Sequence, residues 1–282
     1  MTCAWQAYLN ILPIWLRESV DKLGKEKLQE LRLRLHAPPQ LITVNKELTL
    51  ERRVSIEDLK FCVNVASKYS PWAAQSIAEG YITAQGGHRI GICGHASYQD
   101  ERILTYQGIT SLCIRVARDF PGLSKNLYIY DKSILIIGSP GSGKTTLLRD
   151  LIRQKSNRCP GAISVVDERG EVFPVANGEL LFAAGEKTDV LSGVAKKLGV
   201  EAVIRNMSPR YIAVDEITSE TDCQILIKAG WCGVNLIATA HASSYQDLQK
   251  RSIYRKITEE RLFPCVVVMH RDKSWHIEGE SL

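Results

Sequence analysis

A glycine-rich segment followed by lysine and threonine carries the strongest chemical signal in the sequence. Residues 134–149 read ILIIGSPGSGKTTLLR, an apolar run, a glycine-rich turn and a leucine-bearing stretch. Gly138–Thr145 matches GxxxxGK[ST] at every fixed position. We predict a strand, a loop and a helix, in which the loop N–H groups and the helix N-terminus bind a polyphosphate anion.

This match assigns roles to the residues of the loop. Lys144 is expected to reach the β- and γ-phosphates of ATP, and the Thr145 hydroxyl is expected to bind Mg²⁺. The alternative is a turn that matches by chance, and the strand-to-helix context weighs against it. ATP and Mg²⁺ are therefore the predicted cofactors. The expected nucleotide-binding residues are Gly138, Ser139, Pro140, Gly141, Ser142, Gly143, Lys144, Thr145 and Thr146.

Acidic pairs end two further apolar runs. GAISVVDE predicts a strand that ends at Asp167 and Glu168, and YIAVDEI predicts one that ends at Asp215 and Glu216. The carboxyl ends of parallel strands face the nucleotide crevice in such folds. We expect Asp215 to hold Mg²⁺ and Glu216 to orient the attacking water. The simpler alternative is a pair of solvated strand ends.

The next predicted strand after the one that ends at Asp215 and Glu216 also ends in polar residues. NLIATAHA predicts a strand that ends in Thr239 and His241, which are placed to sense the γ-phosphate. A lone histidine is often only a structural group, so both interpretations of His241 stay open.

The second half of the chain alternates predicted strands and helices from Ile134 onward. This order predicts an α/β domain with a mainly parallel sheet covered on both faces. Helices are expected over VAKKLGVEAVIRNM, from about Thr221 to Trp231, and in a basic stretch around Arg251, before a terminal hairpin. Thr188 and Asp189 fall in a polar stretch with no predicted strand.

The first half has a different pattern. Residues 5–24 predict a helix broken at Pro13, and the alternation of residues 31–36 and LITVN predict strands. Ser55 and the acidic residue three positions later form a capping signal for a helix that ends near Tyr69, followed by a short helix through Ala78. The pair Gly86-Gly87 predicts a hairpin.

Two arginines occur on the predicted strands of this half. Arg89 follows the hairpin turn, and Arg115 lies in the strand ITSLCIRVAR. Each is a candidate phosphate contact, with a solvated or salt-bridged arginine as the alternative. Pro121-Gly122 suggests a boundary near Leu123, which gives domains 1–123 and 124–282.

Composition excludes several classes of protein. The chain has 282 residues with 45% hydrophobic and 24% charged residues, which is typical of a soluble globular protein of two domains. Its net charge of +5 permits contact with nucleic acid but does not require it. The eight cysteines lack metal-ligand spacing and are expected to be reduced and mostly buried. With no apolar run of membrane-spanning length and no signal-peptide pattern, we expect a cytoplasmic protein.

Several motifs together resemble one family. They are IRNMSPRYIAVDEI, TAHA, VVDERGE, QGGHRIG, RVARDFPG and GKTTLLRD. The chain resembles the stage III sporulation branch of the secretion-type traffic ATPases, from RLRLHAPP to the final hairpin. The resemblance implies an N-terminal α+β domain, a RecA-like P-loop ATPase domain, and a homo-oligomeric, hexameric ring with nucleotide between the domains. It also implies an integral membrane partner, part of a channel between mother cell and forespore, reached from the inner face of the membrane.

The resemblance also assigns residues. Glu216 corresponds to the catalytic carboxylate of the Walker B pair, and His241 falls in the histidine box. Asp167 and Glu168 fall in the acidic box, which helps place metal and water. The two arginines Arg89 and Arg115 resemble N-domain arginines that approach the phosphates, and Arg205 resembles a residue that couples neighbouring subunits.

The chain departs from the pattern of the secretion machines at two places. Arg169-Gly170 stands where the acidic box commonly continues with proline, and Thr218-Ser219 stands where an Arg-Asp pair is common. The inter-subunit contact of that pair is therefore in doubt. A nucleic-acid-binding RecA-like ATPase is the alternative function, since the basic stretch around Arg251 allows it, but no nucleic-acid module is visible. A nucleotide-binding scaffold without turnover is disfavoured by the intact hydrolytic residues.

Overall fold

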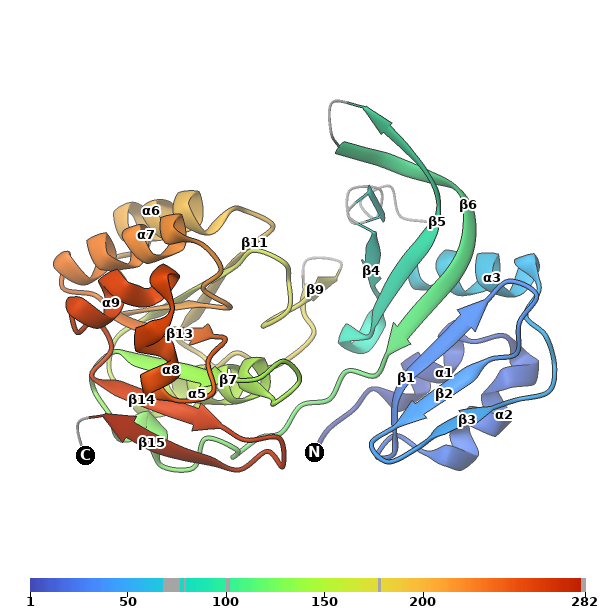
Figure 1. Cartoon of the computed structure of the whole chain (residues 1–282), viewed down its shortest axis with the longest axis horizontal. Coiled ribbons are helices and arrows are strands. Elements are labelled where there is room, and N and C mark those ends of the chain that lie inside the picture. Colours follow the sequence, from blue (N-terminus) through green and yellow to red (C-terminus); the bar gives the residue numbers. More distant parts are fainter. Residues whose placement is uncertain (68–76, 79, 100–101, 177–178, 280–282) are drawn as a thin grey trace. The chain divides into compact units, whose positions relative to one another are not determined.

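The computed structural model describes residues 1–67, 77–78, 80–99, 102–176 and 179–279. They form two compact units (Figure 1). The first unit comprises Met1–Asp119 and Val175–Phe182, and the second comprises Phe120–Pro174 and Ala183–Leu282. The first unit thus ends at Asp119, close to the boundary predicted near Leu123, and it also includes Val175–Phe182, which the sequence did not indicate.

The first unit is built on an antiparallel sheet with strand order β3-β2-β1-β6-β5-β4. Its helices α1, α2 and α3 share one apolar core with the strands. The strands are β1 Leu28–Arg34, β2 Gln40–Thr43, β3 Glu47–Thr49, β4 Tyr81–Thr83, β5 Arg89–Gln99 and β6 Arg102–Arg115. The helices are α1 Trp5–Ile11, α2 Ile14–Leu23 and α3 Ile56–Ser67. A two-stranded ribbon, β9 Val175–Ala176 with β10 Glu179–Leu180, completes the unit.

Local sequence signals explain the starts of these helices. Pro13 separates α1 from α2, because proline has no N–H to continue the first helix but is accepted at the entry of the second. Ser55 Oγ accepts the Asp58 N–H at 3.2 Å, and the Asp58 carboxylate accepts the Ser55 N–H at 2.8 Å. This reciprocal pair is the predicted capping box. The predicted helix end at Tyr69, and most of the short helix before Ala78, lie outside the described residues.

A buried histidine fixes the hairpin between β4 and β5. His88 is 0% exposed. Its Nδ1 accepts the Ala117 N–H at 3.1 Å, and its Nε2 lies 3.0 Å from the Ala4 carbonyl. Burial holds the pKa of His88 below its ordinary value, and the Ala4 carbonyl opposes this shift only in part. The imidazole is therefore neutral in the folded chain.

Acidification is expected to destabilise the protein through His88. In the unfolded chain the His88 imidazole binds a proton near pH 6.5, whereas in the folded chain it binds one only at lower pH. The free energy of unfolding therefore falls as the pH drops below about 6.5. Urea unfolding of the full chain between pH 8 and about 5.5 measures this slope. His88→Asn should be less stable at pH 8 but should lose less on acidification, whereas the exposed His36→Asn should keep the wild-type slope. Equal slopes in all three proteins would contradict the prediction.

The second unit is built on a seven-stranded sheet of order β11-β8-β12-β13-β7-β14-β15. Neighbours are parallel throughout except for the edge strand β15, so the predicted parallel character holds for six strands. The strands are β7 Ile134–Gly138, β8 Ile163–Asp167, β11 Thr188–Ser192, β12 Tyr211–Val214, β13 Asn235–Ala240, β14 Cys265–Met269 and β15 Trp275–Gly279. The helices are α5 Lys144–Arg158, α6 Lys196–Met207, α7 Glu220–Trp231, α8 Tyr245–Lys250 and α9 Arg255–Glu259.

Helices cover both faces of this sheet. Side chains of α6, α7, α8 and α9 share one core with alternate residues of the strands, and Figure 1 shows α6, α7 and α9 together on that side. Helix α5 packs on β7 and β13, and its buried leucines lie outside that core, which places it on the opposite face. The two layers bury the parallel strands on both faces, as is typical of α/β folds.

Three expectations differ from the structure. The polar stretch at Thr188 forms the edge strand β11, which needs no apolar run because it is only half-buried. The basic stretch is not one helix: Arg251 adopts an extended conformation and separates α8 from the 3₁₀ turn Ser252–Tyr254 and α9. The cysteines are not mostly buried, since only Cys62, Cys223 and Cys265 are.

Asp150 on α5 anchors the segment that begins the second unit. Its carboxylate is 0% exposed and accepts the Gly122 N–H at 2.9 Å and the Ser124 N–H at 2.7 Å. The Ser124 hydroxyl and Arg153 donate to it as well. Burial alone would raise the pKa of Asp150, but these donors outweigh burial and hold the pKa below its ordinary value.

Removing this carboxylate is expected to be among the most destabilising single changes outside the site. Asp150→Ala leaves two N–H groups, a hydroxyl and a buried guanidinium without their acceptor, and a broken buried ion pair costs about 3–5 kcal/mol. Asp150→Asn keeps one acceptor oxygen and should lose less. The free energy of unfolding from urea titration of the full chain measures both. Wild-type stability in Asp150→Ala would contradict the anchoring role.

Candidate functional site

The loop between β7 and α5 requires glycine at three positions. Gly141 and Gly143 have φ angles of +73° and +103°, which L side chains rarely adopt. A Cβ at Gly138 would lie 2.6 Å from Ser142 Oγ and 2.8 Å from the Met269 carbonyl. The Ser142 hydroxyl is buried and finds no hydrogen-bond partner among the described residues. An unsatisfied donor in a glycine-built loop at a helix N-terminus fits an anionic ligand.

Lys144 begins α5 and is 7% exposed. Its ammonium donates to the carbonyl oxygens of Gly138 at 3.0 Å and Ser139 at 3.2 Å. It also lies 3.0 Å from His241 Nδ1. Burial lowers the pKa of Lys144, while the nearby carboxylates, chiefly that of Glu216, oppose the shift. The loop therefore holds a largely desolvated cation at its base.

His241 joins this lysine to Glu216. Since the ammonium can only donate, His241 Nδ1 accepts, and the other ring nitrogen carries the proton. That nitrogen, Nε2, lies 2.8 Å from Glu216 Oε1. Lys144, His241 and Glu216 thus form one hydrogen-bonded chain across the ends of β7, β13 and β12. The predicted γ-phosphate-sensing position of His241 is next to both the phosphate loop and the acidic strand.

Thr145 and Asp215 also meet in this region. The Thr145 hydroxyl donates to Asp215 Oδ2 at 3.0 Å, so two of the three predicted metal ligands are in contact. In the part of the chain that the structure describes, no three His, Cys, Asp or Glu side chains converge closely enough to hold a metal ion alone. Mg²⁺ typically keeps several waters and takes one or two protein carboxylates beside phosphate oxygens.

Asp167, a predicted metal ligand, is engaged by backbone. Its carboxylate is 1% exposed and accepts the N–H groups of Glu171 at 2.9 Å, Val172 at 3.0 Å and Phe173 at 2.8 Å. Burial raises the pKa of Asp167, and the three N–H donors oppose this shift. The contacts fix the loop after β8, and this contribution could not be read from the sequence.

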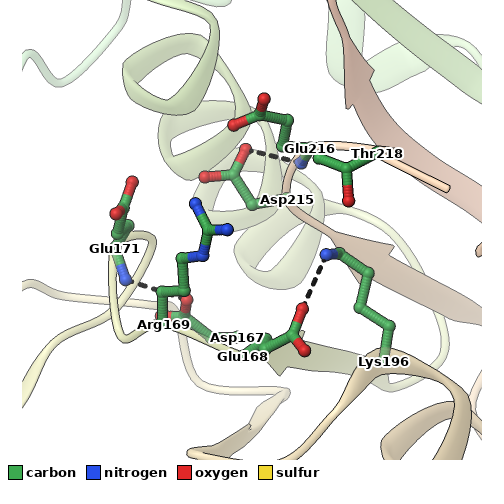
Figure 2. Close-up of a pocket in the computed structure, with 8 residues that line it drawn as sticks. All are labelled: Asp167, Glu168, Arg169, Glu171, Lys196, Asp215, Glu216 and Thr218. Carbon is green, nitrogen blue, oxygen red and sulfur yellow. Dashed lines mark hydrogen bonds and ion pairs between the residues drawn. The ribbon is translucent and has the colours of Figure 1, made fainter. Parts of the chain in front are cut away.

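Glu168, the second member of the acidic box, pairs with a lysine that the sequence did not single out. Lys196, at the start of α6, lies 2.8 Å from the Glu168 carboxylate and 3.8 Å from that of Asp222, and it is 8% exposed (Figure 2). The residues are far apart in the sequence, and only the docking of α6 beside β8 brings them together. No local sequence signal could have found this pair.

Figure 2 shows that the acidic box and the Walker B pair line one pocket. Five carboxylates and two cations line it, so its formal charge is negative and a divalent cation would neutralise much of it. The lining residues are Asp167, Glu168, Arg169, Glu171, Lys196, Asp215, Glu216 and Thr218.

The departure at Thr218-Ser219 has a local function. Thr218 N–H and Ser219 N–H donate to the Asp222 carboxylate at 2.8 Å and 3.2 Å, and the Ser219 hydroxyl accepts the Asp222 N–H. The two contacts between Ser219 and Asp222 form the capping box of α7. The two positions at which the chain departs from the pattern of the secretion machines therefore lie at the start of a helix.

The predicted arginines are distributed over both units. Arg89 and Arg115 belong to the first unit, where they are direct partners across β5 and β6. The Arg89 guanidinium lies 4.1 Å from the centre of the Tyr81 ring, and Arg115 lies 3.5 Å from Glu30. Arg205 is exposed on α6 in the second unit. The structure therefore places Arg89 beside Arg115 in the first unit. In the second unit it brings together the residues of the glycine-rich loop, the acidic pairs and His241.

No helix in the described ranges combines the length and the apolar character that a bilayer crossing demands.

Comparison with known proteins identifies the family. The model of the family described as sporulation stage III, protein AA, matches residues 6–279. The chain belongs to this family. A relative, stage III sporulation protein AA of Bacillus subtilis (strain 168), is 33% identical over 277 residues, which cover 94% of this chain and 90% of the relative. The uncharacterized protein ycf45 of Porphyra purpurea is 27% identical over 86% of this chain and 41% of its own length.

Solved structures of secretion ATPases share the fold of this stage III family member. The Legionella pneumophila ATPase DotB matches with a TM-score of 0.61 at 15% identity, over 94% of this chain and 79% of DotB. The pilus retraction motor PilT with bound ADP matches with a TM-score of 0.60 at 15% identity, over 89% of this chain and 76% of PilT. The mixed α/β, RecA-like fold class of the secretion ATPases is thus confirmed for this chain.

Proposed function

We propose that this chain is a Mg²⁺-dependent ATP hydrolase of the traffic ATPase type. One observation carries the proposal: Lys144, the Thr145–Asp215 contact and the Glu216–His241 pair meet where the adjacent strands β12, β13 and β7 end. A cation for phosphates, a carboxylate and hydroxyl for metal, and a second carboxylate for water are the parts that phosphoryl transfer to water needs.

Each residue has a defined task in this proposal. The loop from Gly138 to Thr146 binds the phosphates, and Lys144 neutralises their charge. Thr145 and Asp215 would hold Mg²⁺, which would neutralise negative charge on the phosphate oxygens. Glu216 orients the attacking water and accepts its proton, while His241 holds the Glu216 carboxylate and contacts Lys144.

The acidic box takes a supporting part. Since both oxygens of Asp167 accept backbone N–H groups, its task is to fix the loop that carries Glu168. Glu168, held by Lys196, helps to place water at the metal site. The metal ligands proposed from this chain are therefore Thr145 and Asp215, with Asp167 acting through the loop.

Arg89 and Arg115 are proposed as phosphate contacts from the first unit. The two arginines are direct partners across β5 and β6, which would let one anion contact both guanidinium groups. Transient contact of this pair with the nucleotide would link turnover to a movement of the first unit.

The work of this hydrolase is proposed to act on a membrane complex of sporulation. Membership in the stage III family, and the fold shared with the secretion ATPase DotB and the pilus motor PilT, support this assignment. The chain would act as a homo-oligomeric ring, hexameric by analogy, in the cytoplasm and at the inner face of a membrane. Its partner would be an integral membrane protein of the channel.

Steady-state ATP turnover of the purified chain against its own concentration tests the proposal. We expect turnover to require Mg²⁺. The turnover rate per chain should rise with protein concentration and should not change when single-stranded DNA is added. Absence of Mg²⁺-dependent turnover at every concentration would remove the hydrolase assignment. Turnover independent of concentration but stimulated by DNA would favour the nucleic-acid-binding alternative.

A further inference from the structure

We infer that Thr239 is a positioning residue that orients both members of the Walker B pair, a role that rests on the proposed hydrolase function. Thr239 lies near the end of β13, directly beside the end of β12, and is 0% exposed. Its hydroxyl is engaged by Asp215 and by the backbone of Glu216. Its effect on turnover is therefore exerted through these two residues.

The hydroxyl of Thr239 makes two hydrogen bonds at once. It donates to Asp215 Oδ1 at 2.7 Å and accepts the Glu216 N–H at 2.9 Å. The same N–H also lies 3.0 Å from Asp215 Oδ1, so the three groups close a small ring. A hydroxyl is the smallest group that donates and accepts in this way, and valine of the same shape can do neither.

This contact sets the direction of the Asp215 carboxylate. With Oδ1 held by Thr239, the other oxygen, Oδ2, faces the Thr145 hydroxyl at 3.0 Å. Without the Thr239 hydroxyl, one donor to Oδ1 is lost and the carboxylate is freer to rotate. Partners that orient a metal ligand typically matter almost as much as the ligand.

Thr239 also supports an unusual backbone at Glu216. The φ angle of Glu216 is +31°, a value that costs a non-glycine residue free energy and persists only where neighbours enforce it. On one side the Glu216 N–H is bound by the Thr239 hydroxyl, and on the other the Ile217 N–H donates to the Thr239 carbonyl at 2.8 Å. Side chain and backbone of one residue thus hold the turn that aims the Glu216 carboxylate at His241.

Thr239→Val and Thr239→Ser, in the full chain, test this inference. The valine variant is expected to lower kcat, measured at saturating Mg²⁺ and ATP, by about 10- to 100-fold, and serine is expected to restore most of the loss. Thr188→Val is the matched control, since it removes a hydroxyl bonded to the Ala184 carbonyl elsewhere in the same sheet. Equal kcat in Thr239→Val and wild type, or a loss that serine does not restore, would overturn the inference.

Two readouts do not depend on turnover. Titration of a fluorescent ATP analogue with and without Mg²⁺ should show that Mg²⁺ tightens binding less in Thr239→Val than in wild type or Thr239→Ser. Hydrogen exchange without nucleotide should be faster at the Glu216 amide in the valine variant only. Unchanged exchange and an unchanged Mg²⁺ effect would refute the positioning role.

These readouts separate the two levels of the proposal. If the wild type shows no hydrolysis, the hydrolase function fails, and the exchange at Glu216 still decides whether Thr239 orders this turn. If the wild type hydrolyses ATP and the valine variant matches it, the function stands and the role of Thr239 fails.

Discussion

Glu216→Gln is expected to lower ATP turnover by about 100-fold or more while nucleotide binding persists. The glutamine side-chain oxygen can still accept from His241 Nε2, which lies 2.8 Å from Glu216 Oε1, so the local geometry is kept. What is lost is the negative charge and the basicity that activate water. Single-turnover hydrolysis and the affinity for a fluorescent ATP analogue measure the two effects separately.

Glu171→Gln is the matched control for this variant. Glu171 lines the same pocket, so its replacement removes the same charge from the same surroundings without touching the end of β12. We expect a loss of less than about tenfold. If both variants lose activity equally, the pocket's total charge rather than the position of Glu216 governs turnover.

Lys144→Ala is expected to remove most of the nucleotide affinity. The ammonium is already desolvated against the carbonyl oxygens of Gly138 and Ser139, so little hydration is lost when it meets a phosphate. Removing one partner of such a buried charge pair costs about 2–5 kcal/mol, or roughly 30-fold to several thousandfold in affinity. Thermal unfolding with and without Mg²⁺-ATP measures the change through the ligand-induced shift in Tm.

The exposed Lys197→Ala serves as the control, because it removes an ammonium from the same unit away from the loop. It should keep the wild-type shift, and Lys144→Ala should show almost none. Without nucleotide, Lys144→Ala should unfold near the wild-type temperature. The variant loses the hydrogen bonds to the Gly138 and Ser139 carbonyl oxygens, but it also loses the cost of burying an ammonium group. An undiminished nucleotide-induced shift in Lys144→Ala would contradict the role given to this lysine.

The parts of the fold that could be predicted from the sequence are those determined by residues that are neighbours in the chain. The loop and α5 follow from one segment in which apolar periodicity changes at a glycine turn, and the break at Pro13 follows from the chemistry of proline. The edge strand at Thr188 was missed because an edge position needs no apolar pattern. The grouping of Val175–Phe182 with the first unit depends on packing across the chain, which no local pattern records.

The same distinction applies to the site. Asp215 and Glu216 could be found because they follow an apolar strand in sequence. The pairing of Glu168 with Lys196, and the capture of both Asp167 oxygens by backbone, arise only when α6 and the loop after β8 are folded. Sequence patterns therefore pointed to the carboxylates that line the pocket, while the groups that restrain these carboxylates become visible only in the folded chain.

Helix α5 makes structural contacts in addition to carrying Lys144, the predicted phosphate ligand. Arg149 donates to the Val172 carbonyl in the loop after β8, Asp150 accepts from the segment at Gly122 and Ser124, and Lys155 donates to the Tyr130 carbonyl. A pull on the segment at Gly122 and Ser124 would therefore act on α5, whose first turn carries Lys144, and also on the edge strand β15, where Trp275 donates to the Leu123 carbonyl. Force on this segment and the chemistry proposed at Lys144 would therefore act on the same helix, to which Asp150 attaches the segment.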